Sequence, residues 1–97
     1  ITREQAANIY ASEADVLNMA LFGKTAKQWR DGHQGVKGNI RDQATIEQLL
    51  VLANIESLNA EFIKMKLPQT DRLISLNKTA ISQLTTFLKN NTAKKLQ

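Results

Sequence analysis

The sequence predicts an all-α domain, a small helical bundle in which two long antiparallel helices carry shorter N-terminal helices packed on them. Helix-capping residues precede the apolar segments, apolar residues recur at helical spacing, and no alternating run of β-branched residues predicts a strand. With 97 residues, of which 42% are hydrophobic and 23% are charged, the chain has the length and composition of one globular domain. We therefore treat residues 1–97 as a single helical domain.

The N-terminal segment predicts a weak helix over residues 2–10 and a stronger helix over residues 12–22. Thr2 is a candidate cap for the first helix. Ser12 can cap the second, because its hydroxyl accepts a hydrogen bond from a free first-turn amide and acidic residues follow it. Gly23 then suits the left-handed residue that commonly ends a helix.

A short helix over residues 25–31 and a structured loop over residues 32–43 are expected next. Thr25 and Gln28 match the capping-box pattern that begins a helix. Trp29 lies at helical spacing, and we interpret it as a hydrophobic anchor rather than a binding residue. The loop holds three of the four glycines and has no strand pattern on either side.

Two long helices over residues 45–66 and 69–90 are expected to form the body of the bundle. Thr45 begins another capping box, and the apolar residues after it point most of the way round the helix. This pattern predicts a buried, central helix. Leu67 and Pro68 predict a tight turn, since proline disfavours helical backbone in the residue before it. The second long helix carries one continuous apolar stripe, and the chain is expected to fray beyond it.

The basic residues are concentrated near the C-terminus. The net charge is +4, and residues 72–97 contain five basic residues and no acidic one. Such lysines can offset the dipole at the end of a helix, or they can form a patch for the phosphates of a nucleic acid. We favour the first interpretation, because the segment has no arginine cluster. The candidates for nucleic-acid binding are Lys78, Lys89, Lys94 and Lys95.

The sequence contains no constellation that indicates a reaction. It has no cysteine, and its one histidine, His33, lacks the partners of a metal site or a hydrolytic triad, so we interpret His33 as a solvated loop residue. We predict a protein that is not an enzyme, with no catalytic residue, metal, cofactor or small-molecule substrate. No apolar stretch approaches the roughly 20 residues that span a membrane, so no membrane contact and a cytoplasmic location are expected. The first residue is Ile1 rather than methionine, so we expect a piece of a longer protein or a processed chain.

Several polar residues on the expected helices have two possible roles. Asparagine is a poor helix former, so asparagines on helices either bond to neighbouring helices or line a polar groove. Arg41 and Asp42 precede a long helix, and we interpret them as a structural pair. The asparagines in question are Asn18, Asn54, Asn59 and Asn77.

An ordered series of segments resembles the C-terminal region of KilA-N domain proteins, which are phage-related and occur in bacteria. The segments are YASEADVLNMALFG, TAKQWR, KGNIRD, EQLLVLAN and LPQTDRL, and the resemblance covers about residues 10–88. In that family the named DNA-binding domain lies N-terminal to this region, and none of its residues are in this chain. The resemblance therefore implies the context of a cytoplasmic, DNA-associated protein and assigns no DNA contact here.

On this resemblance we expect a non-catalytic accessory domain that makes protein contacts or self-associates, with DNA bound only through the N-terminal domain. The alternative is weak, direct nucleic-acid binding through the basic C-terminal helix. The sequence identifies neither the partner, the oligomeric state nor the regulatory role, and it assigns no role to the loop from Gly32 to Gly38.

Overall fold

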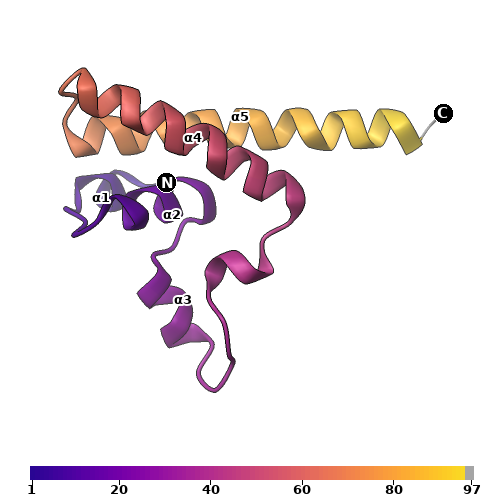
Figure 1. Cartoon of the computed structure of the whole chain (residues 1–97), viewed down its shortest axis with the longest axis horizontal. Helices are drawn as coiled ribbons and strands as arrows, with labels where there is room; N and C mark the ends of the chain where they lie inside the picture. Colours follow the sequence, from indigo (N-terminus) through magenta and orange to yellow (C-terminus); the bar gives the residue numbers. More distant parts are fainter. Residues whose placement is uncertain (96–97) are drawn as a thin grey trace.

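The computed structural model describes the backbone of residues 1–95 and the side chains of residues 1–90. The described chain is helical and contains no strand, which confirms the all-α prediction (Figure 1). Two long helices run in opposite directions across the body, and the shorter ones pack below them (Figure 1). The elements in order are α1 Arg3–Ala7, α2 Glu13–Phe22, α3 Ala26–Gly32, the 3₁₀ helix η1 Ile40–Gln43, α4 Ile46–Lys64 and α5 Gln69–Lys95.

The predicted helix starts are confirmed in atomic detail. Thr2, Thr25 and Thr45 each close a capping box with the glutamine three residues later. The Ser12 hydroxyl accepts a hydrogen bond from the amide of Asp15 at 3.1 Å. Gly23 ends α2 with a φ of 73°, in the left-handed region that glycine enters without penalty. These local bonds fix where each helix begins, before any tertiary contact is made.

The turn between α4 and α5 follows Lys64, two residues before the predicted end of the helix. Lys66 adopts a φ of 60°, its amide donates to the Ile63 carbonyl at 2.9 Å, and the Leu67 amide donates to the Phe62 carbonyl at 3.1 Å. This is a Schellman motif in which lysine occupies the position that usually holds glycine. Pro68 then precedes α5, so the chain reverses within four residues.

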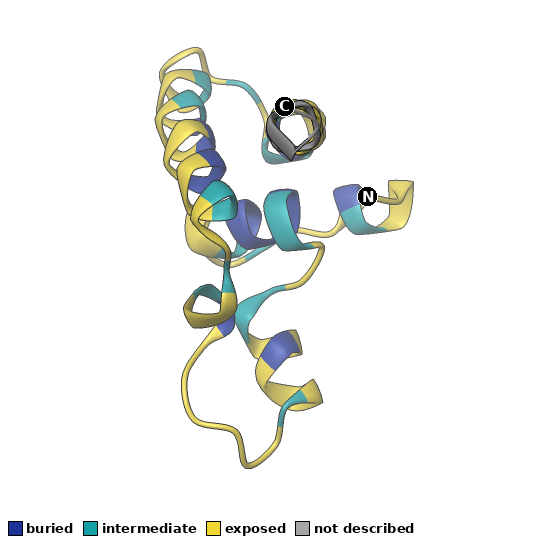
Figure 2. Cartoon of the chain, turned by 90° about the vertical axis from the view of Figure 1, so that its right-hand side faces the viewer, coloured by how far each residue is buried: buried dark blue, intermediate teal, exposed yellow. Residues whose placement is uncertain are grey.

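The core lies where α2, α4 and α5 meet, as the buried positions in Figure 2 show. α2 is short and contributes a run of buried residues from Val16 to Ala20, because α4 and α5 both cover it. Interdigitated apolar side chains exclude water here and drive folding. The buried core residues are Val16, Leu17, Met19, Ala20, Val51, Leu52, Ile55, Leu73, Leu76 and Ala80.

α3, η1 and the loop between them form an arm that extends away from the core (Figures 1 and 2). Trp29 is buried in this arm, as its interpretation as an anchor requires. The expectation for His33 was wrong: its ring stacks on Trp29 with centroids 4.3 Å apart, and its Nδ1 lies 2.7 Å from the Trp29 carbonyl oxygen. His33 is half-buried because it caps α3 and covers the indole. The predicted loop also contains η1, which an Asn39 capping box begins.

Two predictions about the long helices are wrong. The first half of α4 is not central: Ile46 is 75% exposed, and Leu49 and Leu50 are 44% and 50% exposed. Neighbouring helices cover only one side of α4, so the apolar residues on its opposite side face outward. α5 also continues to Lys95, five residues past the predicted end of the helix at residue 90.

Two substitutions on α4 test which side of this helix is buried and which is exposed. We expect Leu52→Ala to lower the free energy of unfolding by about 2–5 kcal/mol, because this side chain is buried and its truncation leaves a cavity. Leu49→Ala lies three residues earlier on the same helix and should cost less than about 1 kcal/mol, because its side chain is half exposed. Urea unfolding followed by circular dichroism measures both, and equal losses would contradict the assignment of the two faces.

Candidate functional site

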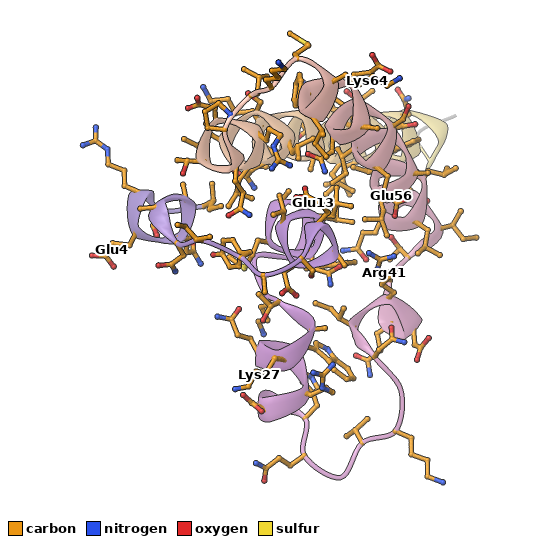
Figure 3. All side chains as sticks on the ribbon, turned by 60° about the vertical axis from the view of Figure 1, so that its left-hand side comes forward. Glu4, Glu13, Lys27, Arg41, Glu56 and Lys64 are labelled. Atoms are coloured by element: carbon orange, nitrogen blue, oxygen red, sulfur yellow. The ribbon has the colours of Figure 1, made fainter. Side chains whose placement is uncertain are left out.

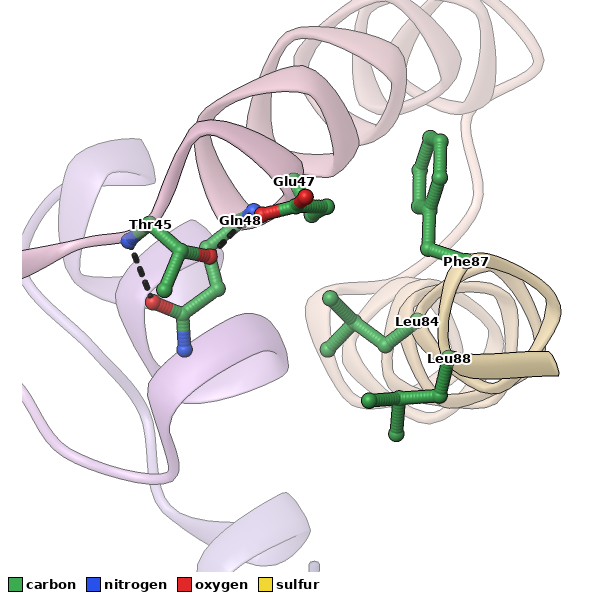
Figure 4. A pocket seen from close by; sticks show the side chains of 6 residues that line it. All are labelled: Thr45, Glu47, Gln48, Leu84, Phe87 and Leu88. Carbon is green, nitrogen blue, oxygen red and sulfur yellow. Dashed lines mark hydrogen bonds between the residues drawn. The ribbon is translucent and has the colours of Figure 1, made fainter. Parts of the chain in front are cut away.

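A pocket of about 300 Å³ opens between the start of α4 and the distal part of α5. Figure 4 shows it from close by: the α5 side chains line one side and the first turn of α4 lines the other. The two helices diverge at this end like the arms of a fork, and we call the cavity the fork pocket. Its lining residues are Thr45, Glu47, Gln48, Leu84, Phe87 and Leu88.

The unequal lengths of the two helices create the fork. α5 has 27 residues and α4 has 19, so α5 runs past the point where α4 begins (Figure 1). The capping box fixes that point: the Thr45 hydroxyl accepts from the Gln48 amide at 3.1 Å, and the Gln48 side chain accepts from the Thr45 amide at 2.9 Å. The apolar stripe of α5 therefore continues where its companion helix has ended.

Apolar side chains surround the fork pocket. Leu84 and Phe87 are half-buried within it, and Leu88 is 68% exposed. Ile46 and Leu50 are close in sequence to the lining residues of α4 and are also exposed. A contiguous exposed apolar patch is typical of a binding surface. We call the six lining residues, together with Ile46, Leu50 and Lys89, the fork surface.

The fork surface carries one charge of each sign. Glu47 lines the pocket from α4 and is half-buried, while Lys89 is exposed on α5. Neither residue has an ion-pair partner among the described side chains, whose ion pairs lie elsewhere. The fork surface therefore presents an acid on one helix and a base on the other, each open to a partner.

The lysines predicted as nucleic-acid contacts are not gathered into one site. Lys78 and Lys89 are both exposed on α5, but eleven residues separate them, which is about 16 Å along a helix axis. Lys78 lies beside α1, where it lines a separate hollow with Ile1 and Arg3. The side chains of Lys94 and Lys95 lie outside the described residues.

An ionic cluster around the buried side chain of Arg72 escaped the sequence analysis. The Arg72 side chain, 10% exposed, donates through its Nη1 to a carboxylate oxygen of Glu13 and to the Asn59 amide oxygen at 3.0 Å. Its Nε donates to the Leu67 carbonyl at 3.1 Å, and Asn59 donates to Glu13 at 2.9 Å. Glu13 lies under the two long helices, as Figure 3 shows. Every partner is a protein group, so the cluster ties helices together.

The four asparagines all bond across elements, which decides between their two possible roles. Asn54 donates to Gln83 at 3.0 Å, and Asn77 donates to the Ala20 carbonyl at 2.9 Å. Asn18 accepts from Arg41 at 3.4 Å, and Asn59 belongs to the ionic cluster. The structural interpretation of Arg41 is also confirmed, since its guanidinium faces Glu56 at 3.6 Å across the junction of the arm and α4 (Figure 3).

The described residues contain no group of three or more histidine, aspartate or glutamate side chains that could hold a metal ion. None of the described helices is long and apolar enough to cross a membrane. No family model, curated protein or solved structure matches the chain. The resemblance to the KilA-N proteins therefore stays a prediction.

Stability should fall in acid in a way that depends on Glu13. The hydrogen bond from Arg72 holds the pKa of Glu13 below its ordinary value of 4.5, against the opposing effect of burial. The unfolded chain therefore takes up this proton at a higher pH than the folded chain. The stabilisation is complete above about pH 4.5 and is lost as the pH falls through the folded-state pKa.

Urea unfolding between about pH 6 and pH 3 measures this dependence. In Glu13→Gln the loss of stability over that range should be smaller than in the parent chain, because the carboxyl that titrates is gone. Glu4→Gln is the matched control, since Glu4 is exposed and makes no ion pair among the described residues. Identical pH profiles for the parent and Glu13→Gln would contradict the role assigned to the cluster.

Proposed function

We propose that this chain is a non-catalytic helical domain that makes protein–protein contacts. The observation that carries the proposal is the fork surface, where apolar side chains of α4 and α5 are exposed around a pocket. Exposed apolar residues cost solubility and add little to folding, so a contiguous set of them is best explained by a partner that covers it. The resemblance to KilA-N proteins supplies the context of an accessory domain of a cytoplasmic, phage-related DNA-binding protein.

The charged and polar groups of the described chain support a binding role over a catalytic one. Arg72, the one buried charged side chain among the described residues, is occupied by Glu13 and Asn59. General acid–base or nucleophilic chemistry needs such a group to be available beside a pocket. The fork pocket instead offers apolar side chains and a single carboxylate, Glu47.

Direct nucleic-acid binding through α5 is the second candidate. Lys78 and Lys89 are eleven residues apart, a spacing that returns to nearly the same face of a helix. The face of α5 that carries these two lysines could contact the phosphates of a nucleic-acid backbone. The carboxylate of Glu47 argues against placing that backbone in the fork, because like charges repel.

A titration against duplex DNA separates the two candidates. We expect no binding at about 100 mM salt, because the four candidate lysines contribute little once their charges are screened. Fluorescence anisotropy at several salt concentrations measures the binding. Binding that weakens with salt and disappears in the variant with Lys78, Lys89, Lys94 and Lys95 all changed to glutamine would favour the nucleic-acid candidate over ours.

Photo-crosslinking in cells tests the protein contact directly. A photoreactive phenylalanine analogue replaces Leu50, which lies half-exposed on the fork surface, or Lys37, which is exposed in the loop between α3 and η1. We expect discrete protein adducts from position 50 and none from position 37. No adduct from position 50, or an adduct to nucleic acid alone, would contradict the proposed function.

A further inference from the structure

We propose that the fork surface binds the same surface of a second copy of this chain, so that the protein forms a two-fold symmetric dimer. The proposal rests on the proposed function and names the partner. The distal part of each α5 inserts into the fork of the other copy, between the first turn of its α4 and its α5.

Shape supports a second copy. A two-fold interface uses one patch twice, so that patch must contain both an element that inserts and a hollow that receives it. The fork surface has both: α5 extends past the end of α4, and the pocket of about 300 Å³ lies beside it. Leu84 and Phe87 line that pocket, so they can contact the inserted helix of the partner while the same contact forms in the other direction.

The charges of Glu47 and Lys89 independently support a second copy as the partner. A helix seated in the fork has α5 on one side and the start of α4 on the other. Lys89 lies about 140° round the helix from Leu84 and about 200° from Phe87, which places it on the opposite side of α5. When Leu84 and Phe87 face the partner's α5, Lys89 therefore faces the partner's α4. Glu47 lines the pocket at that position. The two-fold operation therefore forms two pairs between Glu47 of one copy and Lys89 of the other.

Other occupants satisfy only one of these charges. An acidic helix or a nucleic acid would suit Lys89 and would be repelled by Glu47, and a basic helix would have the opposite conflict. A contact between two α5 helices alone is also unfavourable, because residues 72–97 contain no acidic residue. α4 contributes acids at Glu47, Glu56 and Glu61 against the single base Lys64, so it is the element that a partner's α5 would meet.

Reciprocal charge changes give the decisive experiment. Sedimentation equilibrium of the whole chain should show a reversible dimer of twice the chain mass. Glu47→Lys alone and Lys89→Glu alone should each weaken dimerisation about tenfold or more, because both pairs become like-charged contacts. An equimolar mixture of the two variants should regain most of the affinity as a heterodimer, since each copy then supplies the charge that the other needs.

Matched controls use the same charge changes outside the fork surface. Glu61→Lys at the far end of α4 and Lys37→Glu in the loop between α3 and η1 should leave dimerisation unchanged, alone and mixed. Circular dichroism melts of all variants verify that they fold, and a heterodimer that forms only in the mixture cannot arise from misfolding.

Three outcomes would overturn the proposal: a monomer at every concentration up to about 1 mM, dimerisation unaffected by either single change, or no recovery in the mixture. These outcomes are separate from a failure of the proposed function. Adducts to a different protein from position 50, together with a monomeric chain, would leave the interaction role standing and reject self-pairing. No adduct and no dimer would reject both.

Discussion

The position of Arg72 constrains most of this fold. Its guanidinium reaches α2 through Glu13, α4 through Asn59 and the turn before α5 through the Leu67 carbonyl. A buried guanidinium loses its hydration, and the loss is offset only when its donors all find acceptors. Rotating any of these elements about its axis would remove an acceptor from the cluster. The apolar core supplies the driving force, and Arg72 selects one arrangement of the helices over others of similar burial.

The sequence was sufficient for what is local in the chain. The capping residues Ser12, Thr25 and Thr45 bond within three residues, so their patterns located the helix starts correctly. The ionic cluster could not be found this way, because Glu13 and Arg72 are 59 residues apart and each is an ordinary surface residue by type. The sequence around Lys66 did not predict the Schellman motif, because the left-handed position of that motif usually holds glycine.

The candidate site shows a different limit of sequence reasoning. The dense apolar run at the start of α4 predicted burial on all sides, whereas one side packs on the core and the other is exposed. Apolar periodicity reports how many faces of a helix are apolar and not which of them a neighbour covers. The coverage here depends on the extra length of α5 over α4, and that follows from the position of one capping threonine, Thr45. Of the two candidate lysines whose side chains are described, only Lys89 belongs to the fork surface.

In the proposed function, folding and binding use different sides of α4. On α4, Leu52 faces the core while Leu50, two residues earlier, lies on the fork surface. Since free energy from apolar burial is proportional to the area removed from water, an exposed leucine contributes little to folding and retains most of its potential for a partner. The two functions can then be changed separately by substitution. α5 is divided less sharply: Leu73, Leu76 and Ala80 lie within the core, whereas Leu84 and Phe87 pack against the core and also line the fork pocket.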